Sequence, residues 1–240
     1  MNVSYYYTND TMTSKMDWRY NTLWFEQIES GKIYVENFKE KTTYDNENKI
    51  EKAEYDFLSH LNYEKNLILN LLPADKILYL NLTWANIKNF QCLQDFTALK
   101  RLETHYCLKL ETDTGLSRFS DTIEFLNINQ SKKFTFSDQL LQLKKLKVLC
   151  LNTCAPIESL DFLKHFPQLI DFRFVDTNVL DGNLSPILDH PTIRTVGLLD
   201  KKHYNYKSDK LKLELDSKFN SEYMTKVYKG EFMTYRYDYD

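Results

Sequence analysis

The sequence predicts an α/β solenoid with a curved parallel β-sheet, built from about six tandem units and closed by capping segments at both ends. An apolar pattern recurs every 22 to 24 residues between Ile77 and Leu198. Each unit joins an alternating apolar pattern, typical of a strand, to a wider apolar stripe, typical of a short helix. A period of this length predicts a stacked array in which each unit contacts its neighbours.

The repeating pattern has apolar residues at the first, fourth and sixth positions of each unit. Successive units start 22, 24, 23, 23 and 24 residues apart, and all but one of the eighteen positions are apolar. Since alternate side chains of a strand share one face, the fourth and sixth positions predict the core face of the sheet. The triplets are Ile77-Leu80-Leu82, Leu99-Leu102-Thr104, Ile123-Leu126-Ile128, Leu146-Leu149-Leu151, Leu169-Phe172-Phe174 and Ile193-Val196-Leu198.

Two further columns support this register. Three residues after each triplet, a side chain that can bond backbone is favoured, and the column reads Ala85, Cys107, Ser131, Cys154, Thr177 and Lys201. Later in each unit an apolar column predicts a short helix or an irregular convex segment. Its members are Leu93, Leu116, Leu140, Leu163 and Ile187.

The pattern resembles that of the leucine-rich repeat superfamily, over residues 77–206. The resemblance implies a solenoid with strands on its concave side. It also implies a protein-binding function, because such repeats commonly bind proteins.

The segments outside the repeats are expected to cover the ends of the array. Residues 1–76 predict an N-terminal cap, with a β-hairpin of residues 23–28 and 33–38 around Ser30-Gly31. Ile50, Ala53, Phe57, Leu58 and Leu61 recur at helical spacing and predict a helix. Residues 67–72 fit a helix end or a degenerate extra repeat.

Residues 207–240 predict a C-terminal β cap. Leu211, Leu213 and Leu215 alternate with charged residues, as in an edge strand. Lys229-Gly230 then separates two aromatic-rich segments, 223–228 and 232–237, as in a second hairpin.

Composition and motifs narrow the function. A net charge of −3 disfavours nucleic-acid binding, and no apolar stretch is long enough to span a membrane. The N-terminus has no basic start followed by an apolar core, so we expect a cytoplasmic protein. The four cysteines predict reduced thiols, and the five histidines lie too far apart for a metal site. No phosphate-binding, nucleophile or metal motif is present, which predicts a non-enzymatic protein without cofactor or small-molecule substrate.

The residues between the core positions predict the concave face, because they point away from the core. Trp84, Tyr106 and Phe125 are expected to be exposed there, although burial of each would be favourable by roughly 2–3 kcal/mol. Exposed aromatics beside arginine are typical of interface anchors. The predicted partner-binding residues are Tyr79, Trp84, Arg101, Glu103, His105, Tyr106, Phe125, Asn127, Asn129, Asp171, Arg173 and Asp176.

The first functional hypothesis is therefore a monomeric protein-interaction module that binds a protein through this face. A narrower form is an immunity protein that neutralises a bacterial toxin. A second class is an enzyme, for which Glu103 and His105, two residues apart on one strand, offer an acid–base pair. A third is a translocated effector or surface adhesin.

Overall fold

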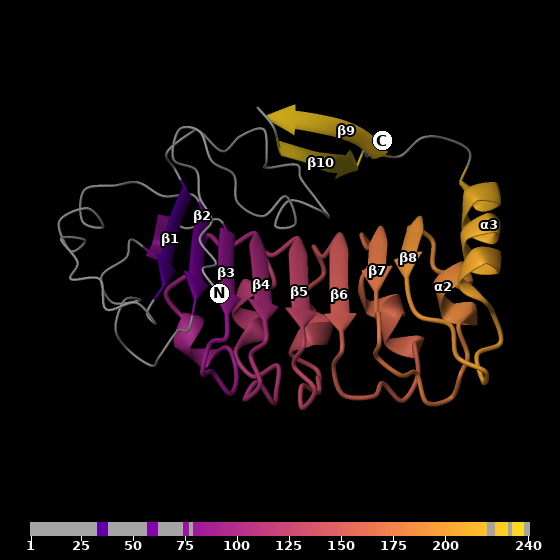
Figure 1. Ribbon diagram of the computed structural model, residues 1–240, viewed down its shortest axis with the longest axis horizontal. Coiled ribbons are helices and arrows are strands. Elements are labelled where there is room, and N and C mark those ends of the chain that lie inside the picture. The colour runs from indigo at the N-terminus through magenta and orange to yellow at the C-terminus, as the bar shows by residue number, and fades with distance from the viewer. Residues whose placement is uncertain are drawn as a thin grey trace.

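The computed structural model describes residues 33–37, 57–61, 74–76, 79–219, 224–229 and 232–237. It contains an eight-stranded parallel sheet in the order β1 to β8, so strand order follows sequence order (Figure 1). The strands are β1 (Ile33–Asn37), β2 (Phe57–Leu61), β3 (Tyr79–Thr83), β4 (Arg101–His105), β5 (Phe125–Asn129), β6 (Val148–Asn152), β7 (Asp171–Arg173) and β8 (Thr195–Gly197).

The strand register confirms the predicted repeat. Leu80, Leu102, Leu126, Leu149, Phe172 and Val196 pair in sequence across the sheet, each the fourth position of its unit. All of them are buried except Val196, which is half-buried in the last strand. The chain therefore has a leucine-rich repeat fold with a continuous apolar core.

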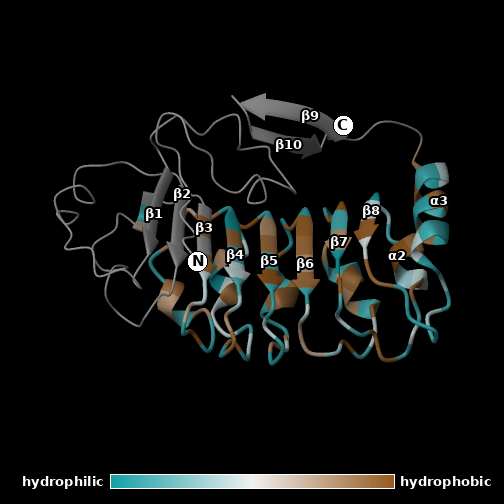
Figure 2. Ribbon diagram, in the orientation of Figure 1, coloured by the Kyte–Doolittle hydropathy of each residue, from teal (hydrophilic) through white to brown (hydrophobic). Residues whose placement is uncertain are grey.

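The convex segments are short, as predicted. They are the 3₁₀ turns η1 (Ala74–Lys76), η2 (Gln91–Leu93), η3 (Leu116–Phe119), η4 (Leu140–Gln142) and η5 (Asp161–His165), and the helix α2 (Ser185–Asp189). Their apolar column from Leu93 to Ile187 is fully buried. Figure 2 shows β5 and β6 as mostly apolar, whereas the turn after β5 is polar.

The sheet begins earlier than the sequence indicates. The helix predicted through Phe57, Leu58 and Leu61 is wrong, because β2 is a strand that pairs in parallel with β3. A segment of five residues is too short to separate the helical period from the strand period. Pairing of β2 with β3 satisfies the backbone N–H and C=O groups along the edge of β3. The strand β1 lies within the predicted segment 33–38 and pairs in parallel with β2. Residues 23–28 and 67–72 lie outside the described residues.

The C-terminal part mixes a wrong prediction with a correct one. Leu211, Leu213 and Leu215 lie in the helix α3 (Ser208–Lys218), not in an edge strand. Leu211 and Leu215, four apart, are buried where α3 packs beside β8 and α2, whereas Leu213 is 69 % exposed. The strands β9 (Met224–Lys229) and β10 (Phe232–Tyr237) pair antiparallel, as the predicted hairpin requires. Within the described ranges, no helix has the length and apolar character needed to cross a membrane.

Candidate functional site

The concave face consists of the strand side chains that point away from the core. They form three rows across β4 to β7, because the strands are in register. The inner row holds Arg101, Phe125, Val148 and Asp171; the middle row holds Glu103, Asn127, Cys150 and Arg173; the outer row holds His105, Asn129 and Asn152.

Most of the inner and middle rows is buried, which corrects the prediction that this face is exposed throughout. Phe125 is 0 % exposed, and Arg101, Glu103, Asn127 and Asp171 are buried as well. Part of this cover comes from within the inner row, where the Arg101 guanidinium lies over the Phe125 ring, 4.3 Å from its centroid. These five residues therefore offer little surface to a partner in this structure.

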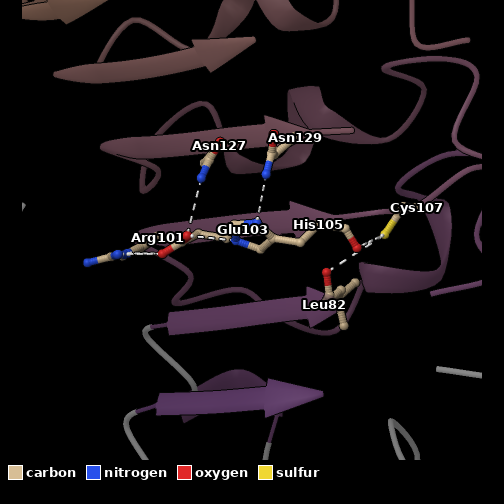
Figure 3. A network of polar contacts seen from close by, with 7 residues as sticks. All are labelled: Leu82, Arg101, Glu103, His105, Cys107, Asn127 and Asn129. Carbon is tan, nitrogen blue, oxygen red and sulfur yellow. Dashed lines mark hydrogen bonds and ion pairs between the residues drawn. The ribbon is translucent and has the colours of Figure 1, made fainter. Parts of the chain in front are cut away.

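A polar network joins Arg101, Glu103 and His105 along β4 (Figure 3). Arg101 Nε donates to Glu103 Oε1 at 2.6 Å, and its guanidinium forms an ion pair with the same oxygen. His105 Nε2 lies 3.0 Å from Glu103 Oε2. From β5, the Asn127 amide donates to Oε2 at 3.3 Å, and the Asn129 amide lies 3.3 Å from His105 Nδ1.

The network makes Glu103 a poor general base. Burial alone raises the pKa of Glu103, but the Arg101 charge and the His105 hydrogen bond outweigh it and lower the pKa to about 2. Both His105 ring nitrogens already have polar neighbours, Glu103 and Asn129. The acid–base pair that the sequence offers is thus part of a buried ion-pair network, an arrangement that favours a structural role.

The strand β7 carries a second ion pair in the reverse order. Arg173 Nε donates to Asp171 Oδ2 at 3.0 Å. A Cβ at Gly197 would lie 3.1 Å from Arg173 Cγ, so glycine leaves room for this side chain. Cys150 lies between Asn127 and Arg173 on the middle row, and burial raises its pKa well above the ordinary value. The predicted partner-binding residues do not include Cys150. Its place between Leu149 and Leu151 nevertheless marks it as a concave-face residue.

The residues at one equivalent position of the repeat, directly after β3 to β6 and three residues after the end of β7, have a distinct backbone. Trp84, Tyr106, Gln130, Thr153 and Asp176 all have φ between 51° and 58°, the left-handed region. The first four each donate the backbone N–H to a carbonyl of the next repeat, as in Trp84 to His105 at 2.7 Å. The ladder of the sheet therefore continues through this conformation. A single sequence gives no direct signal for it beyond the shared position in the repeat.

Two of these left-handed positions carry exposed aromatic side chains. Trp84 is 39 % exposed and Tyr106 is 45 % exposed, as predicted. Their rings meet edge to face, with centroids 6.0 Å apart and planes at 68°. Leu108, two residues further on, is 65 % exposed. We call Trp84, Tyr106 and Leu108 the aromatic edge.

The predicted site residues therefore separate into groups. Trp84, Tyr106 and Asp176 are exposed, and His105, Asn129 and Arg173 are half-buried. The five corrected residues above are buried, and the side chain of Tyr79 lies outside the described ones. Of the predicted residues, the structure brings the exposed aromatics Trp84 and Tyr106 into contact with each other.

A pocket of about 280 Å³ lies elsewhere, beside the turns after β5 and β6. Its lining is mainly apolar and includes Phe136 and Phe162. Cys154 also lines it, but its thiol donates to Ile128 O, and burial raises its pKa to about 12. Among the described residues, no group of three or more His, Cys, Asp or Glu side chains is arranged to hold a metal ion. The polar convergence typical of an active site is not found in this pocket.

The parallel register, the buried repeat columns and the convex 3₁₀ turns define a leucine-rich repeat solenoid. Among solved structures, the chain is similar to internalin C2 of Listeria monocytogenes, with 20 % identity and a TM-score of 0.39 over 61 % of this chain and 70 % of that one. It is also similar to a second Listeria monocytogenes internalin, InlF, with 14 % identity and a TM-score of 0.33 over 62 % of this chain and 58 % of that one. No protein-family model matches the sequence, and no curated protein matches it.

Proposed function

We propose that the chain is a non-enzymatic protein-binding module whose contact surface is centred on the aromatic edge. This proposal narrows the predicted surface from the whole concave face to the exposed residues at the carboxyl ends of β3 and β4. The buried inner and middle rows would then hold the strands in place beneath that surface.

The observation that carries the proposal is the conformation of Trp84 and Tyr106. A bulky residue in the left-handed region is an outlier that costs about 1–2 kcal/mol, whereas Gly or Asn adopts it readily. Both residues also remain more than a third exposed, so they forgo part of the free energy that burial would provide. The repeat imposes this conformation at five equivalent positions, so folding explains the conformation but not the choice of exposed aromatic residues at two of them.

The chemistry of the edge suits protein recognition. Interfaces concentrate their binding free energy in a few Trp, Tyr and Arg anchors, surrounded by polar residues. The edge-to-face contact fixes both rings before a partner arrives, so less side-chain freedom is lost on binding. Half-buried polar groups of the outer row, such as His105 and Asn129, lie beside the anchors.

The test compares three forms of the full chain as bait in lysate of the source organism. They are the wild type, the double variant Trp84→Asn/Tyr106→Asn, and the control Leu213→Asn on the exposed side of α3. We expect a stoichiometric protein partner with the wild type and the control, and its loss with the double variant. A partner retained equally by all three forms would contradict the proposed surface.

A further inference from the structure

The turns after the strands divide into a basic half and an acidic half. Residues 84–92, 106–114 and 130–138, which follow β3, β4 and β5, expose Lys88, Lys109, Lys132 and Lys133 against two acidic residues, Glu111 and Asp138. Residues 153–161 and 174–182, which follow β6 and β7, expose Glu158, Asp161, Asp176 and Asp181 and contain no lysine or arginine. The aromatic edge lies in the basic half, although the whole chain has a net charge of −3.

The backbone brings the basic residues of adjacent turns together. Thr112 and Thr135 form a parallel bridge, and Lys109 and Lys132 each precede a bridge residue by three positions. Neighbouring parallel strands are about 4.8 Å apart, so these lysines occupy equivalent places in adjacent turns. None of the four lysines forms an ion pair with another residue of the described part of the chain. We call Lys88, Lys109, Lys132 and Lys133 the basic rim.

We infer that the partner at the aromatic edge is a protein that presents acidic residues around an apolar anchor, an inference that rests on the proposed function. The anchor contacts Trp84, Tyr106 and Leu108, and the acidic residues face the basic rim. Opposite charges across an interface speed association and exclude partners of the wrong sign. A partner with a basic surface would instead face four lysines that have no ion-pair partner in the described part of the chain.

A nucleic acid fits this surface less well. Its bases stack on parallel aromatic faces, whereas the two rings meet at 68°. The basic stretch covers three turns, or roughly 10 Å between the first and the last strand. A polyanion that followed the edge further would reach Glu158, Asp161 and Asp176, which repel it. A short acidic peptide segment matches the length of the basic rim.

A random dodecapeptide display library, selected against the full chain, tests the inference. We expect the enriched peptides to be acidic with an aromatic or aliphatic residue. A synthetic peptide of this type should bind with an affinity that falls as salt is raised. The variant Lys109→Glu/Lys132→Glu/Lys133→Glu should weaken this affinity by about tenfold or more, as charge reversal at an interface does.

The matched control reverses three exposed lysines elsewhere, Lys164→Glu/Lys202→Glu/Lys212→Glu, and changes the net charge equally. We expect its affinity to stay within about twofold of the wild type, since these lysines lie outside the basic rim. An equal loss in both variants would overturn the inference. Circular dichroism of each variant checks that the fold is retained.

The failures of the two proposals can be told apart. Enriched peptides that require Trp84 and Tyr106 but have no acidic preference would overturn the inference and leave the proposed function intact. Peptides that bind Trp84→Asn/Tyr106→Asn as well as the wild type would contradict the proposed function itself. A single-stranded dT20 oligonucleotide is tested in parallel, and tight binding that depends on the basic rim would overturn the inference in favour of a nucleic acid.

Discussion

The rings of Trp84 and Tyr106 meet edge to face, 6.0 Å apart, from equivalent left-handed positions of adjacent repeats. The peptide N–H of Trp84 donates to the carbonyl of His105, directly before Tyr106, so the backbone sets the spacing of the two side chains. This relationship joins the fold to the proposed function.

The double variant Trp84→Asn/Tyr106→Asn should change stability little. Asn relieves about 1 kcal/mol or more of backbone strain at each position, which offsets the loss of the ring contact, about 0.5–1.5 kcal/mol, and of the partial burial of both rings. Urea denaturation should give a free energy of unfolding within about 1 kcal/mol of the wild type. A loss of several kcal/mol would show that the aromatics serve the fold.

The substitution Leu149→Ala should destabilise the chain by about 2–5 kcal/mol, because Leu149 is fully buried in β6. The matched control is Leu213→Ala on α3, which should stay within about 0.5 kcal/mol of the wild type. Equal effects of the two substitutions in urea denaturation would contradict the described core.

The repeat columns predict the middle of the fold well because burial recurs there with a fixed period. Short segments are harder. The pattern of Leu211, Leu213 and Leu215 fits a strand, yet Leu211 and Leu215 also lie one helical turn apart, and packing beside β8 favours the helix. Phe125 shows a second reason why the sequence falls short. The alternation of side chains along a strand places Phe125 on the concave face, but it does not reveal that other groups cover this side chain. The left-handed φ of Trp84 is likewise a backbone property that the residue type argues against.

Two buried threonines should respond oppositely to replacement by valine. Thr177 Oγ1 donates to Leu151 O at 2.7 Å and accepts from Cys154 N at 2.9 Å. Thr104 Oγ1 is buried and has no hydrogen-bond partner among the described residues. Thr177→Val should therefore cost about 1–3 kcal/mol, whereas Thr104→Val should stabilise the chain by up to about 1 kcal/mol. Thermal and urea denaturation of both variants measures the difference, and the same sign for both would contradict these assignments.

The ion pair of Arg101 and Glu103 should make stability sensitive to acid. The pKa of Glu103 is about 2 in the folded chain, below its ordinary value of 4.5. The pair therefore stabilises the folded chain above about pH 4.5, and this contribution is lost as the pH falls toward 2. Urea denaturation between pH 7 and pH 3 should show a flatter acid limb for Glu103→Gln than for the wild type. Identical profiles would contradict this role for the ion pair.

The burial of Arg101 also changes the effect expected from Arg101→Ala. The sequence alone predicts weaker partner binding with intact folding. In the structure this substitution leaves Glu103 as a buried charge that has lost its guanidinium, which costs about 3–5 kcal/mol. Urea denaturation should show that Arg101→Ala lowers the free energy of unfolding by this amount. An unchanged free energy of unfolding would instead support the expectation of intact folding.

Site-specific photo-crosslinking tests the central claim most directly. The crosslinking amino acid p-benzoylphenylalanine replaces Tyr106 in one form of the chain and Leu213 in another, each expressed in the source organism. The aromatic edge, as a protein-binding surface, predicts one dominant protein adduct from position 106 and none from position 213. An absence of adducts at position 106, or the same adducts at both positions, would contradict it.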